Sequence, residues 1–183
     1  MIKRKWFMYY DDPPVWIFGD RIIISWDVAI TSSDRSDWSV GTVWQQRGKQ
    51  FYLLDVIRKR LEFPELKRAV VDTANKFYRP VVLIEDVSIG TSLIQQLKAE
   101  GKVRVIGIRP QGSKVDRMSA QSPVIESGSL LLPRSAPWLD AYLAELVAFP
   151  TGKNDDQVDS TSQALNWGDP AQPKFGVLGK GIR

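Results

Sequence analysis

The stretch Arg21-Ile22-Ile23-Ile24-Ser25-Trp26-Asp27 contains the strongest strand signal in the chain, and it ends in an aspartate. Its β-branched and apolar residues predict a strand that is buried on both faces of a sheet. A second apolar run, Val81–Ile84, ends at Glu85-Asp86, and a third spans Val103–Ile108. Ligand sites in such sheets lie outside the strand ends, so Asp27 and Glu85 are expected at one edge if their strands are neighbours.

The segments around these strands predict the rest of the architecture. Ser39–Gln46 and Gln50–Ile57 alternate as strands do, and Arg47-Gly48-Lys49 forms the hairpin turn between them. Ser129–Pro133 is either a short strand or a buried link. Apolar residues at helical spacing predict helices over Glu62–Tyr78, Ser92–Glu100, Gln111–Ser127 (with Pro123 a candidate interruption), Trp138–Phe149 and Asp156–Trp167.

This order of elements predicts the fold class. Three antiparallel strands come first, and helices then alternate with further buried strands. The expected fold is α/β, with an antiparallel three-strand meander plus parallel strands in one mixed sheet and helices on both faces, as in ribonuclease H-like folds.

The composition excludes several classes of enzyme. The 183 residues include no cysteine and no histidine, which excludes disulfides, histidine- or thiolate-ligated zinc and Ser-His triads. A formal net charge of +4 permits a polyanionic partner without establishing one. No apolar run is long enough to cross a membrane, and the basic N-terminus lacks the apolar core of a signal peptide. We therefore expect a cytoplasmic protein with no membrane partner.

A second informative stretch is Gly152-Lys153-Asn154-Asp155-Asp156-Gln157-Val158-Asp159, which places three carboxylates within five residues at the start of the predicted last helix. Like charges this close destabilise a fold unless positive charge lies among them. In a chain without histidine or cysteine, the expected neutraliser is a hard divalent cation. Together with Asp27 and Glu85, these carboxylates predict a site for two Mg²⁺ or Mn²⁺ ions about 3.5–4 Å apart, which would hydrolyse a phosphodiester.

The three aspartates of this stretch are not equivalent. Asp156 and Asp159 share one helix face, whereas Asp155 points differently and is the candidate helix cap. We predict Asp156 as the main metal ligand, Asp155 as the next candidate, and Asp159 either behind the ligands or as a helix-stabilising acid. The alternative is that all three only cap the helix and complement its dipole.

Charged residues elsewhere carry weaker signals. Asp34 and Asp37 follow Asp27 in a polar loop, where they either lean toward the metals or are solvated. Lys114 and Arg117, on a predicted helix, either contact phosphates of DNA or form a solvated helix face. Lys153 is expected to neutralise the adjacent acids or to contact DNA.

With these residues in place, the chain resembles the C-terminal nuclease domain of the large terminase subunit of tailed bacteriophages or prophages. The most specific piece is Phe149–Asp159, which contains the Asp-Asp pair. The other matching pieces, which extend the resemblance over most of the chain, are Ile2–Asp11, Ser25–Ala29, Leu83–Gly90, Leu93–Leu97, Lys114–Met118 and Glu126–Pro133.

The resemblance implies a metal-dependent endonuclease that cuts concatemeric, double-stranded viral DNA at the start and end of packaging. In that family the strand-one aspartate, the strand-end acid and one aspartate of the pair bind the metals, which here implies Asp27, Glu85 and Asp155 or Asp156. The family often has histidine before the pair, where this chain has Asn154; this departure removes a candidate auxiliary ligand or proton carrier. The implied partners are DNA, the terminase ATPase domain, the small terminase subunit and the portal.

The predicted domain organisation has three parts. Residues 1–20, broken by Pro13-Pro14, are expected to be an extended lead-in from a missing ATPase domain, residues 21–168 the nuclease domain and residues 169–183 a flexible tail. No Gly-x-x-x-x-Gly-Lys-Ser/Thr loop is present, so an isolated domain or prophage remnant would cleave without translocating DNA. Two alternatives stay open: a Holliday-junction resolvase or ribonuclease H of the same fold, and a non-catalytic docking module of the packaging motor.

Overall fold

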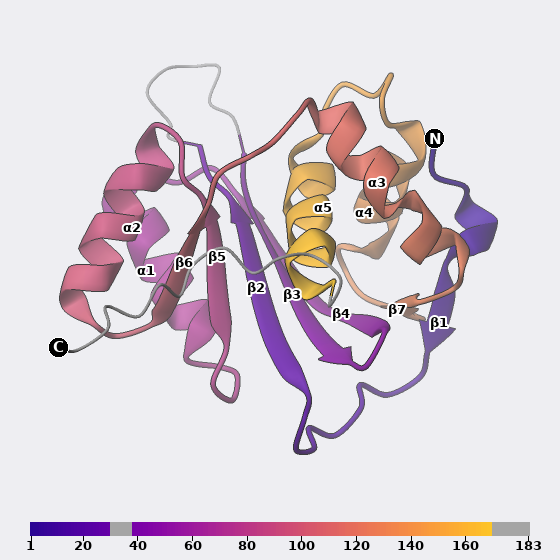
Figure 1. The fold of residues 1–183 in the computed structure, drawn as a ribbon, viewed down its shortest axis with the longest axis horizontal. Coiled ribbons are helices and arrows are strands. Elements are labelled where there is room, and N and C mark those ends of the chain that lie inside the picture. The colour runs from indigo at the N-terminus through magenta and orange to yellow at the C-terminus, as the bar shows by residue number, and fades with distance from the viewer. Residues whose placement is uncertain (30–37, 170–183) are drawn as a thin grey trace, which may run out of the picture.

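A mixed seven-stranded sheet with helices on both faces organises the molecule (Figure 1). The computed structural model describes residues 1–29 and 38–169. The strand order across the sheet is β1-β7-β4-β3-β2-β5-β6, in which β2, β3 and β4 pair antiparallel and the other neighbours pair parallel. This arrangement confirms the predicted fold class, with its antiparallel meander and added parallel strands.

The elements lie close to their predicted positions. The strands are β1 (Met8–Tyr10), β2 (Arg21–Asp27), β3 (Ser39–Arg47), β4 (Gln50–Lys59), β5 (Val81–Glu85), β6 (Arg104–Ile108) and β7 (Leu130–Pro133). The helices are the short 3₁₀ turn η1 (Arg4–Trp6), α1 (Phe63–Ala74), α2 (Ile89–Glu100), α3 (Lys114–Glu126), α4 (Leu139–Ala148) and α5 (Asp156–Gly168).

Two helices differ from the prediction for local reasons. α3 continues through Pro123 without interruption. A proline there cannot donate to the carbonyl four residues earlier, but the Ser122 hydroxyl donates to that carbonyl, Ser119 O, at 2.8 Å. α1 ends at Ala74 rather than Tyr78, because the chain leaves the helix in tight turns before Arg79, which has a φ of 47°.

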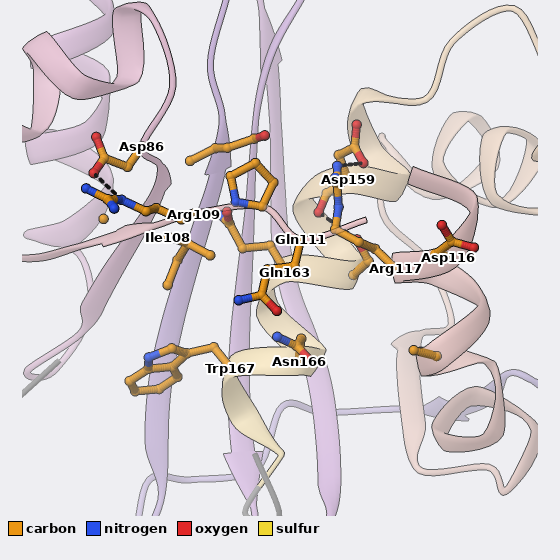
Figure 2. Close-up of a pocket in the computed structure, with 15 residues that line it drawn as sticks. Asp86, Ile108, Arg109, Gln111, Asp116, Arg117, Asp159, Gln163, Asn166 and Trp167 are labelled. Atoms are coloured by element: carbon orange, nitrogen blue, oxygen red, sulfur yellow. Dashed lines mark hydrogen bonds and ion pairs between the residues drawn. The ribbon is translucent and has the colours of Figure 1, made fainter. Parts of the chain in front are cut away.

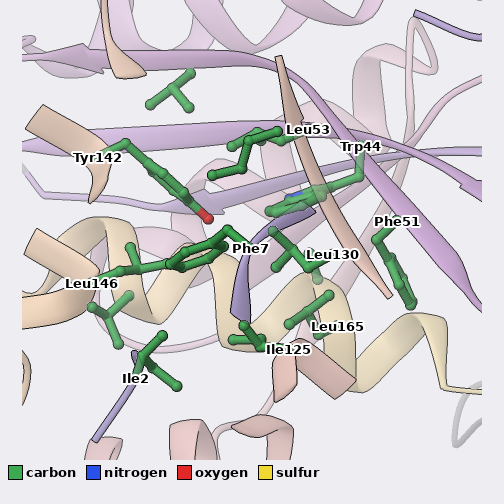
Figure 3. Packing of buried hydrophobic residues seen from close by; sticks show 14 of the residues in the cluster. Ile2, Phe7, Trp44, Phe51, Leu53, Ile125, Leu130, Tyr142, Leu146 and Leu165 are labelled. Carbon is green, nitrogen blue, oxygen red and sulfur yellow. The ribbon is translucent and has the colours of Figure 1, made fainter. Parts of the chain in front are cut away.

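Alternating residues of the central strands supply two separate cores. Ile22 and Ile24 of β2 point to the face covered by α1 and α2, whereas Ile23 points to the face covered by α3, α4 and α5. On the second face, Figure 3 shows Trp44 and Leu53 of the sheet packed near Tyr142 and Leu165 of the helices. The Ile-rich run is therefore buried on both faces, as its composition predicts.

The N-terminal segment forms part of this sheet. β1 pairs in parallel with β7 at the sheet edge, Phe7 is 4% exposed in the core, and the Tyr10 hydroxyl donates to Leu53 O at 2.6 Å. Phe7 and Tyr10 of this segment therefore pack on the domain, whereas Phe18 is exposed. The proposed boundaries at residues 20 and 168 stay predictions, and residues 170–183 lie outside the described part of the chain.

A glycine allows α2 to begin directly beside the end of β5. A Cβ atom on Gly90 would overlap the backbone oxygen of Glu85. No side chain fits there, so the close contact between the helix start and Glu85 requires glycine at this position. Gly90 therefore fixes where the Glu85 backbone lies.

We expect Gly90→Ala to lower the free energy of unfolding by about 1–3 kcal/mol, because the backbone of Glu85 and Asp86 must move to admit the methyl group. Chemical denaturation followed by circular dichroism measures this loss. Ser92→Ala, at an exposed position in the same helix, is the matched control and should cost nothing. Equal stability of the two variants would contradict the close-contact role of Gly90.

Candidate metal centre

Two carboxylates lie next to each other where β2 and β5 end. These strands are parallel neighbours, and Trp26 is paired with Ile84, so Asp27 and Glu85 occupy the next position on each strand. α5 begins at the same edge of the sheet (Figure 1). The predicted meeting of Asp27, Glu85 and the start of the last helix is therefore what the structure has.

A buried set of hydroxyl groups holds α5 on the sheet. The Ser160 hydroxyl donates to Ser25 O and lies 2.7 Å from the Thr42 hydroxyl. Gln163 donates to the Ser25 hydroxyl at 2.9 Å, and Thr161 bonds the buried Tyr142 hydroxyl. Because unpaired polar groups at these depths would cost about 1–3 kcal/mol each, the helix has one favourable position over β2 and β3.

The first turn of α5 is held by a residue of α4. Glu145, which is 8% exposed, accepts the backbone N–H of Gln157 at 2.7 Å and its side-chain amide at 2.6 Å. Asp155 occupies the N-cap position, but its side chain makes no capping hydrogen bond. The Asp155 side chain is therefore not the helix cap that the sequence suggested. The Glu145 carboxylate accepts the free backbone N–H of Gln157 in the first turn instead.

The clustered carboxylates raise one another's pKa. Burial is the largest cause of a pKa of Asp27 well above its usual range, and the charges of Asp159 and Asp156 raise it further. Burial raises the pKa of Glu85, with Arg117 opposing and Asp159 adding to the shift. Burial, followed by the charges of Glu145 and Asp155, raises the pKa of Asp156 to about 6. Burial is thus the main cause of these raised pKa values, and repulsion between the carboxylates adds to it.

Two cations of α3 reach this cluster. Lys114 Nζ lies 2.7 Å from Asp155 Oδ1 and 2.5 Å from Asp159 Oδ2, and an Arg117 nitrogen lies 2.8 Å from Asp159 Oδ1. Although burial opposes its charge, the two carboxylates raise the pKa of Lys114. From the sequence, Lys114 and Arg117 were expected either to contact phosphates or to be solvated, and these ion pairs were not predicted. The two cations offset part of the negative charge of the clustered carboxylates.

The donor set fits a hard divalent cation. Every candidate ligand is a carboxylate oxygen, the type that Mg²⁺ and Mn²⁺ prefer. Burial and neighbouring carboxylates raise the pKa values of Asp27 and Asp156, so a bound cation would stabilise their charged forms. Within the described residues, no three acidic side chains are close enough together to hold one ion. Lys114 and Arg117 partly neutralise the cluster in this conformation, so metal binding would require the acids to close around the ion.

A cavity of about 660 Å³ opens beside the cluster, between the ends of β5 and β6 and the helices α3 and α5 (Figure 2). Glu85 and Asp159 line its acidic end, and Arg117 extends from α3 to Asp159. On the opposite wall Arg109 lies 3.9 Å from Asp86. The lining is completed by Gly107, Ile108, Pro110, Gln111, Asp116, Ala120, Ser162, Gln163, Asn166 and Trp167.

The remaining predicted site residues are less involved. Lys153 and Asn154 are exposed in the turn before α5, and Asp34 and Asp37 lie outside the described residues. Sequence reasoning missed Glu145 and its ion-pair partner Arg58 of β4, whose guanidinium lies 3.8 Å from the Glu145 carboxylate. A helix acid such as Glu145 gives no sequence signal of its contact with Gln157, whereas the alternation of β4 could have indicated that Arg58 faces the site.

The fold and this acidic edge together define a ribonuclease H-like domain with a carboxylate site. Residues 24–167 match the family described as the terminase RNaseH-like domain. The chain therefore belongs to the terminase RNaseH-like domain family. No helix within residues 1–29 and 38–169 has the length and apolar character needed to cross a membrane.

Solved structures of viral terminases share the fold. The large terminase nuclease of the thermophilic phage G20c with bound magnesium has a TM-score of 0.68 at 14% sequence identity, and the match covers 88% of this chain and 93% of that one. The zinc-bound form of the same nuclease has a TM-score of 0.68 at 16% identity, and the match covers 87% of this chain and 93% of that one. The human cytomegalovirus terminase nuclease domain, soaked in manganese with an inhibitor bound, has a TM-score of 0.57 at 12% sequence identity. The match covers 82% of this chain and 83% of that one.

A longer terminase matches over one part of its chain. The large terminase of another thermophilic bacteriophage, solved in complex with ADP, gives a TM-score of 0.67 at 12% identity, and the match covers 90% of this chain but 43% of that one. The present chain thus spans less than half the length of that protein. Among curated proteins, no significant match is found.

Removing one crowded charge should stabilise the metal-free protein. The pKa of Asp156 is about 6 in the folded state, against 3.8 ordinarily, so the folded state binds the proton more tightly. The free energy of unfolding then falls as pH rises from about 4 to 6. At pH 7 in chelator, we expect the free energy of unfolding of Asp156→Asn to be higher than that of the wild type. The difference should be on the order of 1 kcal/mol, once solvent screening is allowed for.

Thermal melts in chelator at pH 4 and pH 7 measure this difference, which should nearly vanish at pH 4. Asp72→Asn, which removes an exposed carboxylate on α1, is the control and should show no such pH-dependent gain. A lower melting temperature of Asp156→Asn at pH 7 would contradict a net cost of the half-buried Asp156 charge in the folded state.

Proposed function

We propose that this chain is a metal-dependent endonuclease that cleaves double-stranded DNA during viral genome packaging. The observation that carries the proposal is the meeting of Asp27 and Glu85, on neighbouring parallel strands, with the acids of α5 at one sheet edge. Membership of the terminase family supports DNA as the substrate. The metal-bound structures of related nucleases support the use of divalent ions.

In this proposal Asp27, Glu85 and Asp156 hold the metals, with Asp155 as the alternative ligand and Asp159 adjacent. Two Mg²⁺ or Mn²⁺ ions, when bound, would supply an activated water and stabilise the leaving 3′ oxygen of the phosphodiester. Glu145 keeps the first turn of α5 in place by accepting both hydrogen bonds from Gln157. The cavity beside Glu85 and Asp159 gives one DNA strand access to the acids.

Lys114 and Arg117 have two tasks in this proposal. In the ion-free site they neutralise Asp155 and Asp159. Once cations bind the carboxylates, these side chains would be available to phosphate oxygens, which both side chains bind well. Charge neutralisation and the phosphate contact that the sequence suggested are then successive states of the same residues.

The rest of the packaging motor lies outside this chain in the proposal. The longer bacteriophage large terminase that was solved with ADP, of which the match covers 43%, supports a nuclease domain joined to an ATPase domain in the complete protein. We propose that residues 1–20 lead from such an ATPase domain. We further propose that the small terminase subunit and the portal bring concatemeric DNA to the site.

Removal of Asp27 or Glu85 should abolish cleavage. We expect plasmid DNA to be cut in Mn²⁺ or Mg²⁺ and left intact in chelator, and Asp27→Ala and Glu85→Ala to lower the rate by about 100-fold or more, because each removes a charge that holds the ions. A supercoiled-plasmid nicking assay measures the rate. Asp72→Ala, on α1 at the opposite face of the sheet, should cut as the wild type does.

The same variants separate the alternatives. Calorimetry with Mn²⁺ should show binding by the wild type and loss of binding by Asp27→Ala; a docking module would show no carboxylate-dependent heat. Competition with four-way junctions and RNA–DNA hybrids tests the other enzymes of this fold. Preference for either substrate over duplex DNA, or wild-type cutting by Asp27→Ala, would contradict the proposed function.

A further inference from the structure

Arg58 lies in line with the acidic edge, two strands away from Asp27. Asp27 is paired with Val40 of β3, and Val40 is paired with Arg58 of β4. Paired residues point to the same face of a sheet, and neighbouring strands are about 4.8 Å apart, so Arg58 is about 10 Å from Asp27 across the α5 face. That face is confirmed by the contact of Arg58 with Glu145 of α4, at 3.8 Å.

Arg58 and Arg60 share one indole ring. The guanidinium carbon of Arg58 lies 4.7 Å from the centroid of Trp38, and that of Arg60 lies 4.4 Å from it. Residues two apart along an extended chain point the same way, and Trp38 immediately precedes Ser39, the residue paired with Lys59. We call these three residues, Trp38, Arg58 and Arg60, the Trp38 platform.

The positive charge of the platform is only partly balanced by the described residues. Both carboxylate oxygens of Glu145 already accept hydrogen bonds from Gln157, so its ion pair with Arg58 is shared. Arg58 Nε is buried and makes no hydrogen bond within the described part of the chain. Arg60 is exposed. A guanidinium stacked on an aromatic ring keeps its N–H groups directed along its edge, the arrangement that binds phosphate.

Two groups of cations lie near the acids. Lys114 and Arg117 reach the cluster from α3, which packs beside α5, whereas the platform stands on the β3–β4 side of Asp27. A polyanionic strand that crosses the acids toward β4 would therefore meet a second group of cations after about 10 Å, a span of a few phosphates.

We propose that Trp38, Arg58 and Arg60 form a phosphate-binding platform that holds the DNA backbone a few phosphates away from the cleaved bond. This inference rests on the proposed function, because it takes duplex DNA as the substrate. Trp38 orders the two guanidinium groups, and Arg60 makes the more accessible contact. Contacts of this type position DNA without selecting its sequence.

Arg60→Gln tests the platform with little risk to folding, because Arg60 is exposed just after β4. Binding of a labelled duplex of about 30 base pairs is measured by fluorescence anisotropy at several salt concentrations, in chelator, which prevents cleavage. We expect the affinity for the duplex to fall about 3–10-fold. The negative slope of log K against log salt should become shallower by about 1, because one phosphate contact is lost. Arg60→Lys should restore the slope.

Lys49→Gln is the matched control, because Lys49 is exposed in the turn at the other end of the same β3–β4 hairpin. It should leave both affinity and slope unchanged. In the cleavage-competent protein, Arg60→Gln should raise KM and leave kcat unchanged, and Trp38→Leu should weaken binding through loss of the stack. Unchanged binding by Arg60→Gln, or an equal loss in Lys49→Gln, would overturn the platform.

The two proposals fail in different ways. If the wild type cleaves with Mn²⁺ and Asp27→Ala does not, while Arg60→Gln binds DNA normally, the platform is rejected and the nuclease stands. If the wild type does not cleave but Arg60→Gln loses affinity and salt dependence, the platform stands as a DNA contact and the nuclease is rejected.

Discussion

The position of α5 on the sheet depends on one buried serine. Ser160 donates to Ser25 O and bonds the Thr42 hydroxyl, which in turn accepts a hydrogen bond from the Trp44 indole. α5 also buries Val158, Ala164 and Leu165, but apolar burial is non-directional. A shift of the helix would leave several buried polar groups unpaired, at about 1–3 kcal/mol each. One hydrogen-bonded register is therefore strongly preferred. That register brings the acids of the first turn of α5 to the ends of β2 and β5.

The cost of this arrangement is electrostatic, and α3 offsets part of it. Burial first, and then the charges of Asp159 and Asp156, raise the pKa of Asp27 well above its usual range. The ion pairs of Lys114 and Arg117 with Asp155 and Asp159 tie α3 to α5 beside the cavity. Arg117 thus takes part both in neutralising the acidic edge and in lining the cavity. A divalent ion would compete with them for the carboxylates.

Much of the fold and the acidic part of the site could be predicted from local patterns. Apolar runs marked β2 and β5, and an acid at the end of each run marked the site edge. Contacts between residues far apart in the chain have no local sequence pattern that predicts them. The placement of Arg58 beside Trp38, the hydrogen bonds of Glu145 with Gln157, and the pairing of β1 with β7 depend on strand register and helix packing. α3 continues through Pro123, where proline is expected to interrupt a helix. The Ser122 hydroxyl donates to Ser119 O, the carbonyl that Pro123 leaves without a backbone donor.

The three aspartates at the start of α5 differ in what already balances their charge. Asp159 is 4% exposed and contacts both cations of α3, and Asp155 shares Lys114 with it. Asp156 has a carboxyl pKa raised to about 6, and neither α3 cation forms an ion pair with it among the described residues. The carboxylate with the least local compensation gains most from a bound cation. This difference favours Asp156 as the metal ligand of α5 in the proposed site, with Asp159 holding the cations of α3 beside it.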